Sequence, residues 1–329
     1  MKERILSALT CLTTIFSGNA CVAGDSATNT AATVIMVPPE GFKHNEQTAA
    51  SNVFQSDIGS VDTTELAMRE FNNMVAVLRS NDVNVLLLHQ DKSLPDAVFP
   101  NNWFSTEIDK NGKTDVYIYP MLTQNRRDEV NIENLQKLLQ SNHVSINKII
   151  DLRANTNKIL EGTGSLILDR KNRFVYAALS ERTNKELVAA FAAKLNYQAI
   201  MFHALDTRGF PIYHTNVVMG LSDDFSVVCL ECIKDDGERA QVENSLKKLG
   251  PVIAISQAQL QEMCGNVLAL RNQNGQKLLV MSERAQRHFT LQQLTLIQKY
   301  SKIVPVKIDT IENVGGGSAR CMMAEIFHQ

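Results

Sequence analysis

The order of apolar and polar residues repeats five times along this chain. Each unit has a strand-like apolar run or hairpin, then an amphipathic helix, then a closing apolar strand. The repeat length is roughly 50–60 residues. The pattern therefore predicts an α/β protein built from five ββαβ units.

The turn and cap residues between these runs locate the elements. Asn111-Gly112 and Asn274-Gly275 predict hairpin turns. Four helices are predicted to begin at a cap residue with Glu or Gln three positions later: Asp62 with Glu65, Thr183 with Glu186, Asp235 with Glu238, and Thr290 with Gln293. The opening strands are predicted at 33–37, 102–105 with 116–119, 164–168 with 174–177, 217–219 with 225–233, and 267–270 with 278–281. The closing strands are predicted at 83–88, 148–150, 199–202, 252–255 and 303–306.

A single unit of this kind cannot bury all of its apolar surface. A helix that covers one small sheet leaves the other face and edge of that sheet without a neighbour, and a ring of units supplies both. No G-x-G-x-x-G follows the first strand, which argues against an open dinucleotide-binding sheet. We therefore expect residues 33–329 to form one domain, a closed five-bladed αβ propeller with its site at the axis.

The first 32 residues lie outside the repeat. A charged start at Met1–Arg4 precedes the apolar run Ile5–Phe16 and then small residues, an order that resembles a secretory signal peptide. Residues 1–23 are therefore a candidate signal peptide, followed by a disordered joint at 24–32. The apolar run is too short to span a bilayer stably. Removal of the leader would make the protein secreted or periplasmic, and retention would leave it cytoplasmic.

Composition narrows the function classes. The net charge is −2 and no Lys/Arg block is interleaved with aromatic residues, so no nucleic-acid partner is indicated. No H-x-x-x-H or paired acid/His helix spacing occurs, so no metal or cofactor is expected. Cys229 and Cys232 form a C-x-x-C within the predicted strand at 225–233, where they would point to opposite faces. We interpret them as core residues.

Near the last residues, Gly315-Gly316-Gly317 leads to Cys321. Glycine allows positive φ and close approach of the backbone to a ligand, so this run is a candidate shaped loop carrying a nucleophile. The same residues also suit a simple turn before a final strand, with Cys321 as a small buried hydrophobe. This stretch alone leaves both interpretations open.

Polar groups stand at corresponding positions where the other units begin. They are Asp96, Asn101 and Asn102 in the second unit, Glu161 in the third, and His214 and Asn216 in the fourth. Each has an ordinary explanation, such as a turn after Pro95 or a hydrogen-bonded histidine at a strand end. Their recurrence at matched positions indicates a shared site.

Taken in order, these segments resemble the pentein, or guanidino-group-modifying, superfamily. It includes arginine deiminases, dimethylarginine dimethylaminohydrolases, amidinotransferases and the bacterial citrulline-utilisation hydrolases related to arginine deiminases. The resemblance covers roughly residues 33–329 and is carried by five segments: Phe42 to Asn52, Phe99 to Ser105, Leu160 to Gly162, Tyr213 to Asn216, and Gly315 to Cys321.

The resemblance implies a five-bladed pentein fold and a cysteine-dependent hydrolase that cleaves a C–N bond. Cys321 would attack the central carbon of a guanidino or ureido group and form a covalent intermediate. His214 would protonate the leaving nitrogen and then activate water, while Glu161 would orient it. Asp96 matches a substrate-binding acid. The partner would be a small-molecule amino acid, and the oligomeric state is not readable.

Departures from the family pattern concern the substrate. Asn101-Asn102 stands where methylarginine hydrolases carry acids, and Asn216 where arginine deiminases carry Asp. Because an amide suits a neutral urea and paired carboxylates suit a guanidinium, we expect citrulline ahead of arginine or methylarginine. Glu107 would reverse this preference if it faced the pocket. An amidinotransferase, and a catalytically silent propeller that binds a ligand or a protein, are the alternatives.

Overall fold

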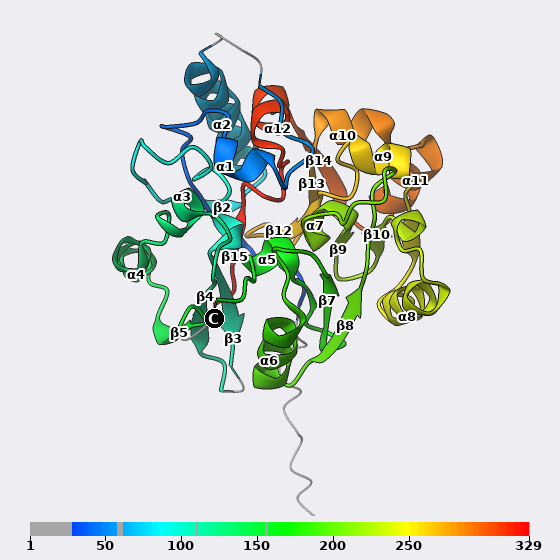
Figure 1. Cartoon of the computed structure of the whole chain (residues 1–329). Coiled ribbons are helices and arrows are strands. Elements are labelled where there is room, and N and C mark those ends of the chain that lie inside the picture. Colours follow the sequence, from blue (N-terminus) through cyan, green and yellow to red (C-terminus); the bar gives the residue numbers. More distant parts are fainter. Residues whose placement is uncertain (1–27, 58–61, 110, 155–156, 329) are drawn as a thin grey trace, which may run out of the picture.

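The computed structural model describes residues 28–57, 62–109, 111–154 and 157–328. Within these ranges the strands form five separate three-stranded sheets, as the repeat predicts. Figure 1 shows the sheets arranged as blades around a centre. The candidate signal peptide at 1–23 lies outside the described residues.

Each blade has one antiparallel and one parallel strand pair. In the second to fifth blades a hairpin is joined by a helix to a third strand that runs parallel to its middle strand. These strands are β3 Phe104–Ile108, β4 Thr114–Ile118, β5 Ile146–Asp151, β6 Ile167–Asp169, β7 Phe174–Ala178, β8 Gln198–Phe202, β9 Met219–Leu221, β10 Ser226–Val228, β11 Val252–Ala254, β12 Leu268–Arg271, β13 Lys277–Ser282 and β14 Lys302–Val306.

The first blade closes the ring. Its strands β1 Thr33–Met36 and β2 Asn84–Leu87 run parallel. Its third strand is β15 Ala324–Ile326, which comes from the other end of the sequence and lies against β3 of the next blade. β15 pairs antiparallel with β1, with Thr33 opposite Ile326. A fifth ββαβ unit is thus assembled from both ends of the chain.

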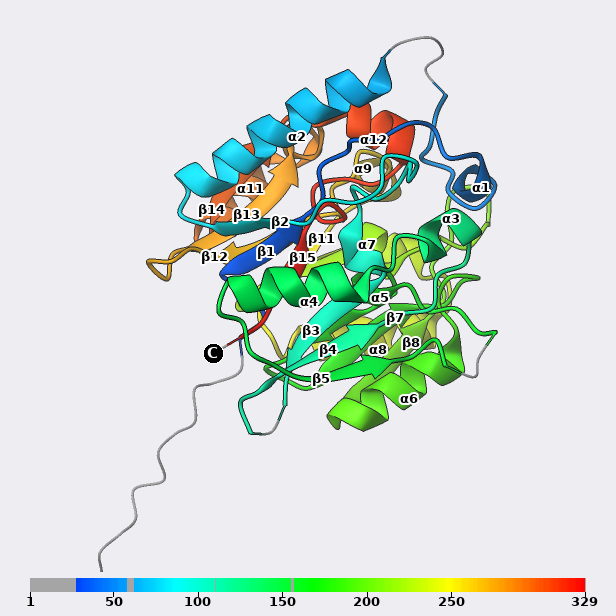
Figure 2. The same ribbon diagram turned by 90° about the vertical axis from the view of Figure 1, so that its left-hand side faces the viewer.

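A helix covers the outside of each blade. These helices are α2 Thr63–Ser80, α4 Ile132–Ser141, α6 Lys185–Leu195, α8 Asp236–Leu246 and α11 Leu291–Gln298, with α10 Glu283–His288 beside the last. Figure 2 shows α2, α4 and α6 following one another along one side. The predicted caps at Asp62, Asp235 and Thr290 accept hydrogen bonds from the residues three positions later. The cap of α6 is Asn184 rather than Thr183.

Helical turns, rather than strands, open several blades at the axis. They are η1 Pro100–Asn102, α5 Gly162–Ser165 and α7 Thr215–Val218; further short helices are α1 Glu46–Ala49, α3 Gln124–Arg127, α9 Gln257–Gln261 and α12 Asp309–Gly315. The predicted strands at 164–168 and 217–219 therefore begin too early. In the first case Gly162 has φ of +45°, which begins a tight turn against the Asn101 and Asn102 carbonyls.

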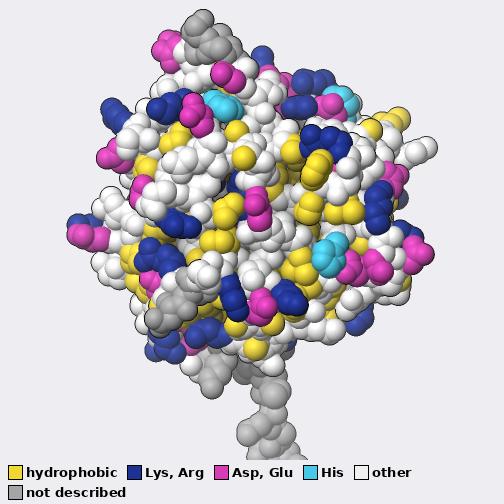
Figure 3. Space-filling model, viewed as in Figure 1, with side chains coloured by type: hydrophobic (Ala, Val, Ile, Leu, Met, Phe, Trp, Pro, Cys, Tyr) yellow, Lys and Arg dark blue, Asp and Glu magenta, His cyan; other side chains and the backbone are white. Residues whose placement is uncertain are grey.

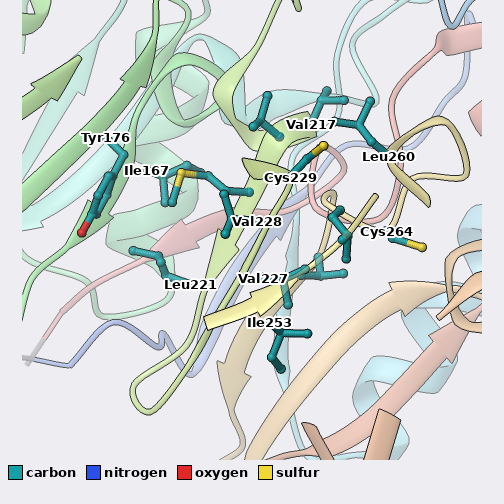
Figure 4. Packing of buried hydrophobic residues seen from close by; sticks show 14 of the residues in the cluster. Ile167, Tyr176, Val217, Leu221, Val227, Val228, Cys229, Ile253, Leu260 and Cys264 are labelled. Atoms are coloured by element: carbon teal, nitrogen blue, oxygen red, sulfur yellow. The ribbon is translucent and has the colours of Figure 1, made fainter. Parts of the chain in front are cut away.

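The predicted strand at 225–233 ends early as well. β10 stops at Val228, and η2 Leu230–Cys232 follows, because the Cys232 N–H donates to the Cys229 carbonyl and folds the chain back. Cys229 and Cys232 are nevertheless buried free thiols, and Figure 4 shows Cys229 beside Val217 within the core. Among the described residues no group of three or more His, Cys, Asp or Glu could hold a metal ion.

Residues 28–32 are ordered, so the predicted disordered joint is wrong for this part. Thr28 and Thr30 donate to the Asp223 carboxylate, as does the backbone N–H of Asn29. The Asn29 side chain donates to Asp169 and to the Ser222 carbonyl. The described part of the chain has no helix long and apolar enough to cross a membrane.

Candidate active site

A cavity lies where the opening turns of the blades converge. Its lining residues are Thr48, Asn52, Asp96, Phe99, Asn102, Arg126, Arg182, Tyr213, His214, Gly315, Gly317 and Cys321. Four of the residues expected from the sequence thus line it directly, and Glu161 and Asn216 contact two of them. On the face drawn in Figure 3, basic and acidic side chains are interspersed around the centre.

Cys321 is delivered to the cavity by the glycine loop. Gly316 ends α12 with φ of +65°. A Cβ on Gly317 would stand 2.9 Å from the Phe99 ring and 3.2 Å from the Cβ of Cys321. The Cys321 N–H donates to the Ser318 carbonyl at 2.9 Å, which sets the final turn. The glycines are therefore needed to bring the cysteine against Phe99.

Two side-chain amides hold the sulfur. The Nδ2 atoms of Asn266 and Asn216 donate to Cys321 Sγ at 3.2 and 3.4 Å. Burial raises the pKa of the Cys321 thiol, although the Ser318 contact and the Asn266 amide oppose the shift. A raised pKa keeps the sulfur in its thiol form in the free protein.

His214 and Glu161 form the second part of the site. Both stand at the N-termini of short helices, α7 and α5, and His214 Nε2 lies 2.8 Å from Glu161 Oε2. Glu161 also accepts from the Leu122 N–H at 3.0 Å and pairs with Arg182 at 3.5 Å. Burial alone would raise the pKa of Glu161, but Arg182 and His214 outweigh it, so the pKa is lowered.

This pairing determines which imidazole nitrogen is free. Burial lowers the pKa of His214 despite the Glu161 contact, so the ring is neutral in the free protein. An ionised Glu161 can only accept, so Nε2 carries the ring proton and Nδ1 carries a lone pair. No hydrogen bond links the imidazole to Cys321 in the described residues, but both line the cavity.

Gly164 makes room for two of these groups. A Cβ there would stand 2.8 Å from His214 Nδ1 and 2.4 Å from Asn102 Nδ2. Both distances are shorter than real Cβ contacts, so only glycine fits. The His214 ring and the Asn102 amide therefore both lie against the Cα of Gly164.

Two buried arginines in the cavity were not expected from the sequence. Arg182 donates to the Thr48 carbonyl and to the Ser51 hydroxyl, and its guanidinium lies 5.1 Å from the centre of the Tyr213 ring. Arg126 pairs with Glu129 at 2.7 Å. No local pattern separates Arg126 from its exposed neighbour Arg127. Arg182 lies in Ser180-Glu181-Arg182, a fragment repeated as Ser282-Glu283-Arg284, which is its one sequence signal.

Arg126 also fixes the orientation of Asn102. Its Nη2 donates to Asn102 Oδ1 at 3.1 Å and to the Phe99 carbonyl at 2.9 Å. A guanidinium has no acceptor, so the amide oxygen must face it and Nδ2 must face away. Nδ2 lies near Gly164, beside the His214 ring.

The buried polar atoms at the site that have no hydrogen-bond partner within the described ranges include Asp96 Oδ1, Asn102 Nδ2, Asn216 Oδ1 and Arg182 Nε. Asp96 uses its other oxygen to accept from Asn45 Nδ2 at 2.6 Å and Thr48 Oγ1 at 3.0 Å. Burial raises the pKa of Asp96, opposed mainly by Arg126. Buried polar groups are normally paired, so these acceptors and donors are available to a bound ligand.

Two expected substrate-binding residues do not line the cavity. Asn101 Nδ2 donates to Thr163 Oγ1 at 3.3 Å behind the wall. Glu107 lies further along β3 and binds Arg170 through both oxygens, at 2.7 and 3.0 Å. The sequence could not reveal this ion pair, because Arg170 comes from the next blade. The expectation that Glu107 could add an acid to the pocket is therefore wrong.

Comparison with known proteins gives a family and a fold. Residues 38–328 match the family model described as N,N dimethylarginine dimethylhydrolase, eukaryotic. No curated protein sequence matches the chain.

Three solved structures share the fold at low identity. The N-terminal domain of ArgZ, an arginine dihydrolase from the ornithine–ammonia cycle in cyanobacteria, is 15% identical with a TM-score of 0.70, over 90% of this chain and 98% of that one. Unliganded AgrE is 17% identical with a TM-score of 0.69, over 90% and 39%. Dimethylarginine dimethylaminohydrolase, as an adduct with S-methyl-L-thiocitrulline, is 13% identical with a TM-score of 0.62, over 90% and 100%. The five-bladed pentein fold is thereby confirmed.

Proposed function

We propose that this chain, which belongs to the N,N dimethylarginine dimethylhydrolase family, hydrolyses a ureido or guanidino amino acid through a covalent Cys321 intermediate, with citrulline as the favoured substrate. Family membership makes the chain a guanidino-group hydrolase acting on non-peptide C–N bonds. The covalent step at Cys321 and the preference for citrulline go beyond what family membership implies.

The orientation of Asn102 carries the substrate preference. Because Arg126 takes its oxygen, Asn102 offers the cavity a donor. A guanidinium has only donors to present, whereas a urea has a carbonyl oxygen that accepts. The open Oδ1 atoms of Asn216 and Asp96 can accept the urea N–H groups. Glu107, which would have favoured a cation, is held by Arg170 elsewhere.

The charges around the cavity suit the rest of an amino acid. Arg126 and Arg182 line it, and a guanidinium is the side chain best shaped for a carboxylate. Asp96 keeps one free carboxylate oxygen for an N–H donor. A substrate with a carboxylate at one end and a neutral urea at the other would therefore find partners at both ends.

The proposed reaction begins with proton transfer from the Cys321 thiol to His214 Nδ1, the free nitrogen of the pair with Glu161. The thiolate attacks the ureido carbon, and the Asn102 amide donates to the oxygen that becomes negative. His214 then protonates the departing ammonia, leaving a thiocarbamate on Cys321. Water, deprotonated by His214, releases a carbamate that loses carbon dioxide and gives ornithine.

Two comparisons support this scheme. A further ArgZ structure is described as covalently bound to a reaction intermediate, and the dimethylaminohydrolase above forms an adduct with a thiocitrulline. ArgZ itself is called a dihydrolase of arginine. For this chain we propose a site suited to the ureido stage of such chemistry.

The test is product analysis by mass spectrometry. The purified protein is incubated separately with citrulline, arginine, methylarginine and agmatine, with Cys321→Ser as the control. We expect ornithine from citrulline, at a higher kcat/KM than any turnover of arginine. Citrulline accumulating from arginine without ornithine would refute the ureido preference. Product that forms only when an amine acceptor is added would favour an amidinotransferase.

We also propose export of the protein after removal of residues 1–23. The support is the order of charged, apolar and small residues at the N-terminus. Sequencing the N-terminus of the protein produced in its own cell tests this. An intact Met1 would refute it.

A further inference from the structure

In four blades, the turn before the strand nearest the axis carries a polar or nucleophilic group of the candidate site. These groups include Asn102 before β3, Glu161 before β6, His214 before β9 and Cys321 before β15. The remaining blade does the same with a residue that the proposed reaction has not used. It is Asn266, two residues before β12 begins at Leu268 and fully buried.

The Asn266 amide is held in one orientation. Its Oδ1 accepts from the backbone N–H of Arg320 at 3.1 Å, and its Nδ2 donates to the backbone carbonyl of Asn216 at 2.9 Å. A backbone N–H can only donate and a carbonyl can only accept, so the amide cannot be turned around. Its Nδ2 is consequently fixed against Cys321 Sγ, at 3.2 Å.

We propose that Asn266 is a catalytic residue that stabilises the Cys321 thiolate by donating a fixed hydrogen bond to the sulfur. This inference rests on the proposed nucleophilic role of Cys321. The contact exists in both protonation states, because the thiol can donate to Asn266 Oδ1, 3.6 Å away. When the proton leaves for His214, Nδ2 remains as the donor to the charged sulfur.

Asn266 is better suited to this task than Asn216. The Asn216 amide donates to the sulfur from 3.4 Å and has its own oxygen free for substrate. Asn266 has both ends anchored to backbone, so forming the thiolate requires no reorganisation of its dipole. A donor to the charged form lowers a pKa, and burial otherwise raises that of Cys321. Asn266 thus offsets the burial that the fold imposes on its nucleophile.

The test measures the sulfur itself rather than turnover. In the substrate-free protein, the rate of Cys321 alkylation by iodoacetamide is followed against pH, with the modified peptide identified by mass spectrometry. Asn266→Asp keeps an acceptor for the Arg320 N–H but replaces the donor by an anion. We expect the midpoint of the pH profile to rise by about one unit or more, which slows alkylation about tenfold below the midpoint.

Asn272→Asp is the matched control. Asn272 is a buried asparagine of the same blade whose Oδ1 accepts from the backbone N–H groups of Asn274 and Gln276, contacts that an aspartate keeps. Its alkylation profile should match that of the wild type. Asn266→Ser, which removes the donor without adding charge, should raise the midpoint by a smaller amount, and it replaces Asn266→Asp if that variant does not fold.

A purely structural Asn266 predicts another outcome. Folded Asn266 variants with the wild-type alkylation midpoint would overturn the proposal, whatever their turnover. With substrate, we expect kcat to fall while KM stays within about twofold, because the contact is to the reacting sulfur. If the wild type turns over none of the candidate substrates, the proposed function fails, yet the alkylation profiles still test the Asn266–Cys321 contact.

Discussion

Asp96 and Glu107 are two buried acids from the second repeat unit, and both were expected to bind substrate. Asp96 stands before the first strand of the blade and lines the cavity, with Oδ1 unpaired. Glu107 stands within β3, with both oxygens bound to Arg170. The difference teaches that a buried acid indicates a binding site when one of its oxygens has no hydrogen-bond partner. When a neighbouring residue binds both oxygens, the acid has a structural role.

The surroundings of the two acids explain this difference. The Arg170 guanidinium lies over the Phe327 ring, 3.7 Å from its centre, and this contact holds it where it can form two hydrogen bonds with Glu107. The donors to Asp96 are the short side chains of Asn45 and Thr48, and they reach only Oδ2. The first arrangement completes an ion pair, and the second leaves room for a ligand.

The largest effect should come from breaking the completed pair. Glu107→Gln leaves Arg170 buried without its charge partner, so we expect the free energy of unfolding to fall by about 3–5 kcal/mol. Urea denaturation measures it. The kcat of the remaining folded protein should be unchanged. The double variant Glu107→Gln, Arg170→Met should recover most of the lost stability; an unrecovered loss would contradict the ion-pair explanation.

Asp96→Asn should give the opposite result. The variant loses a charged acceptor for the substrate, so we expect kcat/KM to fall roughly 10- to 100-fold, since a hydrogen bond to a charged group contributes about 1.5–3 kcal/mol. Stability should change by less than about 1 kcal/mol, because no buried partner loses its charge pair. Steady-state kinetics and urea denaturation together check this. If Asp96→Asn had wild-type kinetics and a large loss of stability, Asp96 would have the structural role that we assign to Glu107.

Gly164→Ala tests how tightly the side chains around the candidate site are packed. Its Cβ would press on the free nitrogen of His214 and on Asn102, so we expect a lower kcat and a loss of about 1–3 kcal/mol in stability. Gly237→Ala is the control, because Gly237 is exposed near the start of α8, where alanine is neutral or mildly stabilising. Equal effects of the two substitutions on kcat and stability would show that His214 and Asn102 are not tightly packed against Gly164.

The smallest effect concerns pH. Burial lowers the folded-state pKa of His214 below its ordinary 6.5, so the unfolded chain takes up the proton first as pH falls. The contribution of His214 is therefore fully present above pH 6.5 and is lost below it, by at most about 1.4 kcal/mol per pH unit. His214→Gln should flatten this acid-side slope in denaturation curves. An unchanged slope would mean that the pKa of His214 is the same in the folded and unfolded states.

Local patterns were enough to predict the five blades and the approximate positions of most residues that meet in the candidate site. Capping residues and apolar spacing are properties of short segments, and the order of Glu161, His214 and Cys321 along the repeats survives in the cavity. The strand at 225–233 was wrong because a hydrogen-bonded turn follows Val228, and an unbroken apolar run contains no signal for it.

Residues defined by long-range contacts could not be predicted. Arg126 and Arg127 are adjacent and chemically alike, yet only Arg126 is buried, because α3 turns it toward Asn102 from another part of the blade. The role of Asn266 likewise depends on Asn216 and Cys321, which meet it only in the closed ring. The available signal was positional, since the fifth was the one unit opening with a hairpin that had no assigned group.

The pairing of β1 with β15, which we call the seam, closes the ring and also holds Cys321 in the candidate site. Cys321 precedes β15 by three residues, and β15 is held to the first blade by pairing with β1. Local opening of this seam would release the closing strand and withdraw the sulfur from Asn266 and His214 together. A partly opened ring would thus carry a cysteine without its neighbours in the candidate site. The arrangement of Cys321 beside Asn266 and His214 is then a property that only the fully closed fold possesses.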